Sequence, residues 1–163
     1  MMVPYFEDDR AWERFLRIID SWEGTPYKHL GMTKGREADC TLFIGGCLIE
    51  AGILLRVEHD YYPRDWHVHT SQELILESFE RHFRNHLAHG FTIAEVDAHA
   101  ERLYRGDVLV FSTVKTLVSN HAGIFLGDGR FANAINGRGF CYLKLRQGWI
   151  DQMTHSFRIM RGN

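Results

Sequence analysis

The stretch His121-Ala-Gly-Ile-Phe-Leu-Gly-Asp-Gly-Arg-Phe-Ala-Asn-Ala134 decides how the second half of this chain folds. Small and apolar residues lie on both sides of a Gly-Asp-Gly sequence at 127–129. Two short runs separated by glycine and aspartate predict a β-hairpin. We therefore expect strands at 121–126 and 130–135, joined by a three-residue turn.

The length of this turn sets which side chains share a face of the hairpin. With three residues in the turn, Gly123 pairs with Asn133 and His121 with Ile135. His121 and Asn133 are then diagonal neighbours on one face, about 7–8 Å apart at the backbone, and their side chains can form a hydrogen bond. Gly123 leaves room between them. A two-residue turn would shift the register by one and place them on opposite faces.

Further strands are predicted on both sides of this hairpin. Asp107-Val-Leu-Val-Phe-Ser112 precedes it, and the segments 140–145 and 155–160 follow an Asn136-Gly137 turn signal. The second half of the chain is therefore expected to hold about five short strands.

The first half is predicted to be mainly helical. Apolar residues recur there every three to four positions, and Thr70-Ser-Gln-Glu73 matches a capping box. Gly45 and Gly46 inside an apolar segment indicate close contact with a neighbouring element. The expected helices run from an Asp8-Asp9 cap to Gly24, from Cys40 to Ala51, from Thr70 to about Ala88, and from Ile93 to Arg102. Helices followed by antiparallel strands indicate an α+β fold.

Length and composition are typical of one globular domain, which we expect to cover residues 1–163. Of the 163 residues, 45% are hydrophobic and 25% charged, and the formal net charge is −2. This balance gives no indication of nucleic-acid or anionic-membrane binding. No apolar run approaches the roughly 20 residues of a membrane-spanning helix. Residues 1–12 lack the basic-then-apolar order of a secretory signal, so we expect the protein to be cytoplasmic at synthesis.

Cys40 lies between Asp39 and the start of an apolar segment, which leaves two interpretations open. It is either a small buried hydrophobic residue or a nucleophile at a helix N-terminus, where its pKa can fall from about 8.5 towards neutrality. A catalytic cysteine also needs a histidine and a third polar group, which His121 and Asn133 would supply. The other two cysteines, Cys47 and Cys141, are predicted to lie in the core.

The remaining histidines suggest a metal site only weakly. His82, His86 and His89 fall on one side of a predicted helix, and such spacing can chelate a metal. Because no acidic residue or cysteine nearby completes a ligand set, an exposed polar helix face is the favoured interpretation. His67 and His69 are assigned to a surface loop.

Four segments and a late tryptophan together resemble a known family. In order they are Gly24-Thr-Pro-Tyr27, Asp39-Cys-Thr-Leu-Phe43, Arg105-Gly-Asp-Val-Leu-Val-Phe111, the hairpin from His121 to Ala134, and Trp149. The chain resembles the NlpC family of bacterial cell-wall cysteine endopeptidases, which are compact relatives of the papain fold. The resemblance runs from about residue 12 to 158. It implies a helical half that carries Cys40, packed against an antiparallel sheet that carries His121 and Asn133.

The resemblance also implies a catalytic triad. Cys40 matches the nucleophile and His121 the base. Asn133 occupies the place where the family usually has a histidine as third member. An amide can still orient the imidazole, and Asn120 or Asn136 could replace Asn133 if the hairpin register differed.

Other matched positions imply substrate contacts. Tyr27 corresponds to a family tyrosine near the nucleophile and is expected to contact the substrate or the oxyanion. Asp39 and the residue after the cysteine, here Thr41, help bind a free substrate amine in some members. Leu42 replaces a small family residue and could narrow the cleft, while Arg105 replaces a proline.

By resemblance, the expected activity is thiol-mediated hydrolysis of an amide bond in a peptidoglycan stem peptide. The expected bond is the γ-D-glutamyl link to diaminopimelate or lysine, with neither metal nor organic cofactor. Two alternatives stay open. One is acyltransferase or esterase chemistry on the same fold, which an apolar cleft around Leu42 would favour. The other is a non-enzymatic phage-tail or assembly protein that keeps the fold for binding.

The segment Tyr61-Tyr-Pro-Arg-Asp-Trp-His67 resembles the phage-associated branch of the family. Tail proteins would then be partners, and a phage-like tail could deliver the enzyme to the cell wall. This segment belongs to an insert, at about residues 56–102, between the cysteine helix and the first predicted strand. We expect the insert to shape specificity.

Overall fold

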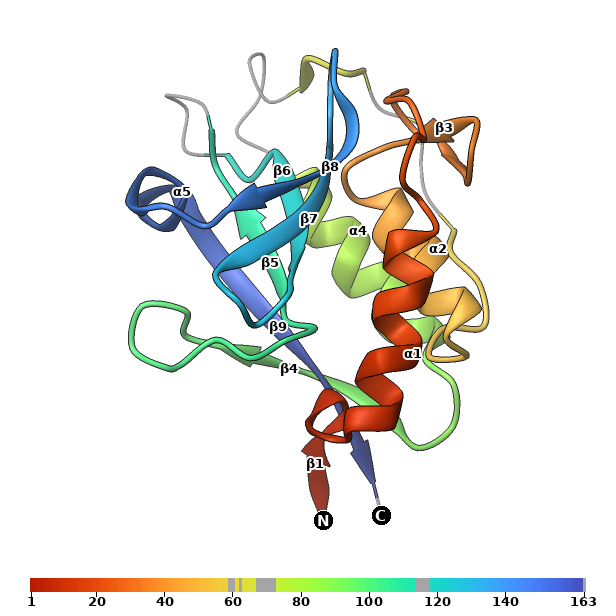
Figure 1. Cartoon of the computed structure of the whole chain (residues 1–163), viewed down its shortest axis with the longest axis vertical. Coiled ribbons are helices and arrows are strands. Elements are labelled where there is room, and N and C mark those ends of the chain that lie inside the picture. Colours follow the sequence, from red (N-terminus) through yellow and green to blue (C-terminus); the bar gives the residue numbers. More distant parts are fainter. Residues whose placement is uncertain (59–60, 62, 67–72, 114–117, 163) are drawn as a thin grey trace.

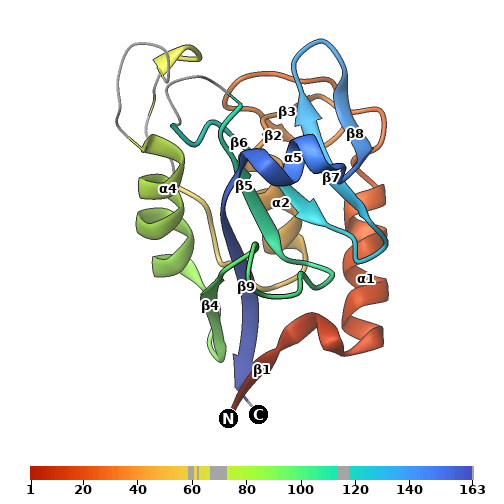
Figure 2. The same ribbon diagram turned by 90° about the vertical axis from the view of Figure 1, so that its left-hand side faces the viewer.

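A computed structural model describes residues 1–58, 61, 63–66, 73–113 and 118–162 of the chain. The fold is α+β, with helices packed against an antiparallel sheet (Figures 1 and 2). The sheet has seven strands in the order β1-β9-β5-β6-β7-β8, with β4 paired to the other side of β9. In the described part of the chain, no helix is long and apolar enough to cross a membrane.

The helices are α1 (Asp9–Asp20), α2 (Leu42–Glu50), α4 (Leu74–Ser78) and α5 (Gln147–Gln152). The strands of the large sheet are β1 (Met2–Pro4), β4 (Phe91–Val96), β5 (Val108–Phe111), β6 (His121–Phe125), β7 (Arg130–Ile135), β8 (Gly139–Lys144) and β9 (Met153–Gly162). A separate two-stranded ribbon joins β2 (Met32–Thr33) and β3 (Glu37–Ala38).

The helices predicted before and after Cys40 in the sequence are confirmed as α1 and α2. Asp8 caps α1 by accepting a hydrogen bond from the Ala11 N–H at 2.7 Å. The two glycines of α2 are needed for close packing, as expected. A Cβ on Gly45 would lie 2.7 Å from Val57, and one on Gly46 would lie 2.6 Å from the Trp22 ring.

The helix expected after Thr70 is confirmed for its described part. Residues 70–72 lie outside the described residues, and α4 begins at Leu74. Wider and tighter helical turns then extend it through Phe79–Phe83 and Arg84–His86. Glu73 occupies the N-cap position of α4, but its side chain forms no capping hydrogen bond with the helix. Its carboxylate instead accepts a hydrogen bond from the Ser119 N–H at 3.1 Å.

The helix predicted from Ile93 to Arg102 is wrong, because residues 91–96 form strand β4. Ile93 and Val96 are buried, and their spacing of three fits a helix as well as an irregularly buried strand. These residues form a strand rather than a helix because β4 pairs with β9 along six residues. With β1 added at the far end of β9, the sheet has seven strands instead of the expected five.

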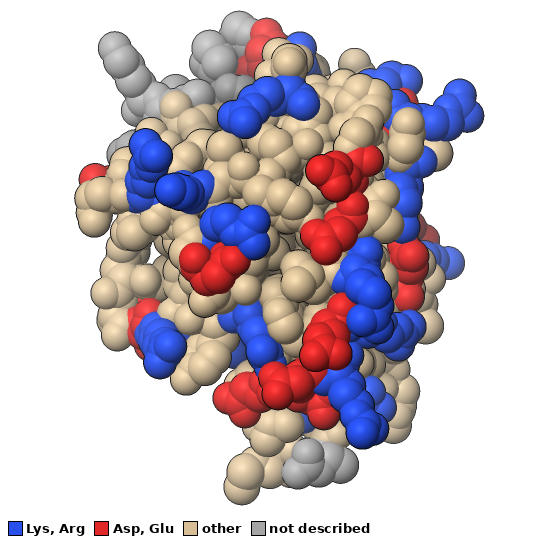
Figure 3. All heavy atoms as spheres, viewed as in Figure 1, with Lys and Arg blue, Asp and Glu red and all other residues tan. Residues whose placement is uncertain are grey.

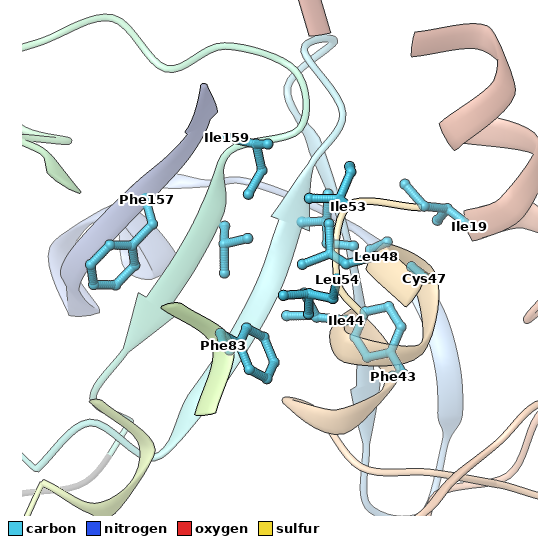
Figure 4. Close-up of a cluster of buried hydrophobic side chains, with 14 of the residues drawn as sticks. Ile19, Phe43, Ile44, Cys47, Leu48, Ile53, Leu54, Phe83, Phe157 and Ile159 are labelled. Atoms are coloured by element: carbon cyan, nitrogen blue, oxygen red, sulfur yellow. The ribbon is translucent and has the colours of Figure 1, made fainter. Parts of the chain in front are cut away.

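Two hydrophobic clusters lie on opposite faces of the sheet. The larger fills the space between the sheet and the helices, and Figure 4 shows Phe43, Cys47, Phe83 and Phe157 within it. The smaller consists of Leu109, Phe111, Phe125, Phe131 and Met153, with Trp149 of α5 packed against it. The sheet is therefore covered on both faces at the point where the β6–β7 hairpin lies.

The surface agrees with the near-neutral charge of the chain. On the face shown in Figure 3, basic and acidic side chains are interspersed rather than separated into patches of one sign. The exposed side of α1 illustrates this, since it alternates acidic residues with Arg10, Arg14 and Arg17.

Candidate active site

A pocket of about 160 Å³ brings residues of the helical half and the sheet together. It lies between the turn that precedes α2 and the β6–β7 hairpin. Its lining residues are Tyr27, His29, Asp39, Cys40, Arg64, Trp66, Ile75, Asn120, His121, Ala134, Ile135 and Asn136.

Cys40 lies two residues before α2 and is 7% exposed. Its Sγ is 3.7 Å from the Thr41 Oγ1, and it accepts a hydrogen bond from the backbone N–H of Ala122, the residue after His121. The start of β6 therefore contacts the sulfur beside the start of α2, and Cys40 and His121 line the same pocket.

Asp39 caps α2 from the residue before the cysteine. Its Oδ1 accepts hydrogen bonds from the N–H groups of Thr41 at 2.9 Å and Leu42 at 3.3 Å. Its Oδ2 accepts one from the Leu30 N–H at 3.0 Å and lies 3.5 Å from His29 Nδ1. Burial raises the pKa of Asp39, but these hydrogen bonds outweigh burial and hold the pKa below its usual value. Asp39 is therefore ionised at neutral pH.

The pKa of Cys40 is raised, so the predicted fall towards neutrality is wrong. Burial raises it to about 12, and the neighbouring Asp39 carboxylate adds to the rise. A helix N-terminus favours a thiolate through its unpaired N–H groups, but here two of those groups bind Asp39 instead. The resting sulfur is therefore a thiol.

The hairpin has the predicted register. Ile124 pairs with Ala132 and Phe125 with Phe131, and the Leu126 N–H donates to the Arg130 carbonyl at 2.9 Å. The turn residues Gly127 and Gly129 have φ of 84° and 79°, a region that favours glycine.

His121 and Asn133 form the hydrogen bond that this register allows. His121 Nε2 lies 2.9 Å from Asn133 Oδ1. The Asn133 amide is completely buried, and its Nδ2 donates to the Cys141 carbonyl at 3.0 Å. Because Oδ1 can only accept, Nε2 carries the proton, and the Nδ1 lone pair is left for a proton acceptor role.

The surroundings of His121 keep its imidazole neutral. Burial lowers the pKa of His121, and the hydrogen bond to Asn133 and the charge of Asp39 only partly oppose this. The ring centroids of Trp149 and Phe111 lie 5.6 Å and 6.0 Å from that of His121. These rings limit the orientations of the imidazole.

Tyr27 enters the pocket from the loop after α1. Its backbone forms a bridge to Ala38, next to Asp39. Burial raises the pKa of Tyr27, and the nearby Cys40 and Asp39 raise it further, so the phenol keeps its proton. The Arg64 guanidinium lies 5.8 Å from the centroid of the Tyr27 ring.

The structure brings most of the predicted site residues together. Tyr27, Asp39, Cys40 and His121 line the pocket, and Asn133 lies behind His121. Thr41 is buried beside the cysteine and is not among the lining residues.

Other sequence alternatives are decided by contacts. Asn120 bonds to Thr113 rather than to His121, and Asn136 lies on the pocket wall without replacing Asn133. Leu42 is 3% exposed and is not among the residues that line the pocket, so it does not narrow the cleft directly.

Cys47 is fully buried in the larger cluster, as predicted. Cys141 is only partly buried, and its Sγ lies 3.6 Å from Asn133 Nδ2, so the prediction of a core residue is wrong.

Sequence reasoning missed three pocket residues, Arg64, Trp66 and Ile75, all from the insert. The signal was the short Arg64-Asp-Trp66 sequence, a cation and an aromatic residue in an otherwise polar segment.

The histidine cluster gains no metal ligands from the fold. His86 Nε2 lies 3.6 Å from Glu58 and His89 is exposed, while the His82 side chain, His67 and His69 lie outside the described residues. Among the residues that are described, no group of three side chains is arranged to hold a metal ion.

Comparison with solved structures shows the same fold. A lipoprotein-like NLP/P60-family protein from Staphylococcus aureus is 22% identical with a TM-score of 0.60, over 93% of this chain and 42% of its own. An NlpC/P60-family protein from Bacillus cereus is 19% identical with a TM-score of 0.59, over 89% of this chain and 39% of its own. This chain therefore spans about two fifths of the length of those two proteins.

A solved domain of about the same length as this chain also has the same fold. The NlpC/P60 domain of the peptidoglycan hydrolase SagA is 15% identical with a TM-score of 0.54, and the match covers 89% of this chain and 96% of that domain. A search of curated proteins found no match. The sequence profile of the NlpC/P60 family matches residues 24–158, so the chain belongs to the NlpC/P60 family.

Proposed function

We propose that the protein is a cysteine peptidase that hydrolyses an amide bond in peptidoglycan stem peptides, with Cys40, His121 and Asn133 as its catalytic triad. The observation that carries the proposal is the 2.9 Å hydrogen bond from His121 Nε2 to Asn133 Oδ1, beside a pocket that also holds Cys40. Membership of the NlpC/P60 family supports the class of enzyme, and the related SagA is named as a peptidoglycan hydrolase.

The reaction begins from a neutral pair, because the pKa of Cys40 is raised and that of His121 is lowered. His121 Nδ1 takes the thiol proton as Cys40 Sγ attacks the scissile carbonyl carbon. The C–S bond forms and the carbonyl π electrons move to oxygen. Asn133 stabilises the imidazolium that results and keeps its ring in place.

The oxyanion is bound by the Cys40 backbone N–H and the Tyr27 hydroxyl. The raised pKa of Tyr27 suits this role, since the phenol must keep its proton to donate a hydrogen bond. The imidazolium then protonates the leaving amine, and the C–N bond breaks. Water, deprotonated by His121, hydrolyses the thioester and restores the thiol. These steps use groups of the protein and water.

By family resemblance, the proposed scissile bond is the γ-D-glutamyl link to diaminopimelate or lysine. The residues 61–67 further suggest the phage-associated branch, so we propose delivery by a phage-like tail. Finding the protein encoded outside any tail gene cluster in hosts without prophages would contradict delivery but leave the enzymatic proposal standing.

The test is digestion of purified peptidoglycan, followed by mass spectrometry of the released peptides. Wild type should produce new amino termini at diaminopimelate or lysine, whereas Cys40→Ala and His121→Ala should produce none. His89→Ala is the matched control, since His89 is exposed and outside the pocket. No release by wild type, in a protein that binds peptidoglycan, would support a binding role instead.

A further inference from the structure

We propose that Arg64, contributed by the insert, binds a carboxylate of the substrate close to the scissile bond and so makes the enzyme selective for anionic peptides. This inference deepens the proposed function and rests on it. It adds a specificity residue outside the catalytic triad, from a segment that the catalytic steps do not use.

The charges that line the pocket point to this role. Among the described residues of the lining, Asp39 and Arg64 are the two that are permanently charged. The Asp39 side chain is only 3% exposed, and hydrogen bonds from three backbone N–H groups already satisfy it. It is therefore not accessible to a substrate group. The charge offered to a ligand is that of Arg64.

Arg64 is exposed at the pocket rim and has no acidic partner within ion-pair distance among the residues that the structure describes. By contrast, Arg84, Arg105, Arg130 and Arg158 each pair with a carboxylate on the same molecule. A guanidinium presents paired N–H donors that match the two oxygens of a carboxylate. Arg64 is thus the cation that a carboxylate entering the pocket would meet.

Two neighbours hold Arg64 in place. Its guanidinium lies 5.8 Å from the centroid of the Tyr27 ring, a distance suited to a cation–π contact. Trp66, two residues along the chain, is 5% exposed and anchors this part of the insert against the pocket. Tyr27 also lies near enough to Cys40 for the cysteine to affect its pKa, and Arg64, Tyr27 and Cys40 line the same pocket.

The chemistry of the proposed substrate provides a suitable group. A glutamyl residue linked through its γ-carboxyl keeps a free α-carboxylate a few bonds from the scissile carbonyl. A diaminopimelate on the leaving side carries a further carboxylate. An ordinary α-linked peptide of neutral residues has neither. A carboxylate site beside Cys40 would therefore select γ-linked, anionic peptides, and the two possible carboxylates can be distinguished by amidating each one.

The experiment measures kcat/KM for two pairs of synthetic peptides. In the first pair the γ-glutamyl α-carboxylate is free or amidated, and in the second the carboxylate of the diamino acid is free or amidated. Wild type should prefer the free acid by about tenfold in one pair, which identifies the carboxylate that is bound. The preference should weaken as salt rises, because the arginine is at the surface.

Arg64→Gln should abolish this preference, because KM for the free acid should rise to that of the amidated peptide. Arg64→Lys should retain part of it, because the charge remains but the paired donors are lost. Arg56→Gln is the control: Arg56 begins the same insert and is exposed, but it does not line the pocket. It should keep the full preference.

Two results would overturn the inference: equal kcat/KM for acid and amide in both pairs, or a preference that survives in Arg64→Gln. If wild type cleaves none of the peptides, the proposed function fails, and the inference is then decided by binding. Calorimetry with the same four peptides should then show that one free acid binds more tightly than its amide, and that Arg64→Gln removes this difference. Equal affinities for acid and amide in both pairs would overturn the inference.

Discussion

The segment that carries Cys40 and the hairpin that carries His121 meet at one pocket, but they hold their side chains in different ways. Cys40 is set by local hydrogen bonds, since Asp39 fixes the start of α2 through the N–H groups of Thr41 and Leu42. His121 is set by strand register, which places it diagonally across the hairpin from the buried amide of Asn133. The helical side thus fixes a thiol, and the sheet side fixes a base.

The difference shows where reactivity comes from. On the helical side, burial and Asp39 raise the pKa of Cys40 by more than its hydrogen bond with Thr41 lowers it. Activation must come across the pocket from the imidazole, whose own pKa is lowered by burial. Variants that disturb the hairpin should therefore cost activity, and variants that disturb the Cys40 segment at Asp39 should cost stability.

The largest effect is expected when the base is removed. His121→Ala should lower kcat/KM for a stem peptide by about a thousandfold, because the imidazole that takes the Cys40 proton is lost. Stopped assays with quantified product would measure this, and circular dichroism should show an unchanged fold. Activity within tenfold of wild type would mean that the hairpin does not activate the sulfur.

Removal of the orienting amide should have a smaller effect. We expect Asn133→Ala to lower kcat about a hundredfold, since the imidazole loses its partner but remains in the pocket. Loss of that hydrogen bond should also lower the pKa of His121 further, because the bond raises it. The pH profile of the variant separates this role from a packing defect, which would reduce activity without moving the profile.

The pH profile of the wild-type enzyme follows from the lowered pKa of His121. Because burial lowers the pKa of His121, kcat/KM should rise with pH to a plateau, with a midpoint below the ordinary value of 6.5. In Asn133→Ala this midpoint should move to still lower pH. A wild-type midpoint above 7 would contradict a buried, neutral imidazole.

At the Cys40 segment we expect a change in stability. Asp39→Asn should reduce the free energy of unfolding at pH 7 by about 2 kcal/mol, because an amide has one acceptor oxygen and leaves either the α2 N–H groups or the Leu30 N–H without a partner. The pKa of Asp39 is lowered in the folded protein, so its stabilisation is present above the unfolded value of 3.8 and is lost as pH falls through the folded value.

Urea unfolding at pH 7 and pH 3 measures this difference. The gap between Asp39→Asn and wild type should shrink at the lower pH. Glu13→Gln, on the exposed side of α1, removes the same charge from a solvent-exposed position and should show no such pH-dependent gap. An equal gap at both pH values would mean that ionisation of Asp39 does not support the helix.

The hairpin and the Cys40 segment also differ in how much of their structure could be predicted from the sequence. The hairpin could be predicted to its register, because a Gly-Asp-Gly turn and a period of two determine which side chains share a face. From the register the contact between His121 and Asn133 followed. The α+β class and the helices around Cys40 also followed from local patterns.

Features that depend on distant parts of the chain could not be predicted. Strand β4 has helix-like spacing, and only its pairing with β9 makes it a strand. The raised pKa of Cys40 depends on burial under β6, and the place of Arg64 depends on contact between the insert and Tyr27. In each case the deciding partner lies far away in the sequence.

The most direct test of the account is to trap the acyl-enzyme. Wild-type protein would be mixed with a stem peptide, quenched in acid during turnover, and digested for mass spectrometry. We predict that the peptide containing Cys40 gains the mass of the acyl fragment, and that the peptides containing Cys47 and Cys141 do not. Product release by wild type without any adduct, together with retained activity in Cys40→Ala, would contradict the role of Cys40 as nucleophile.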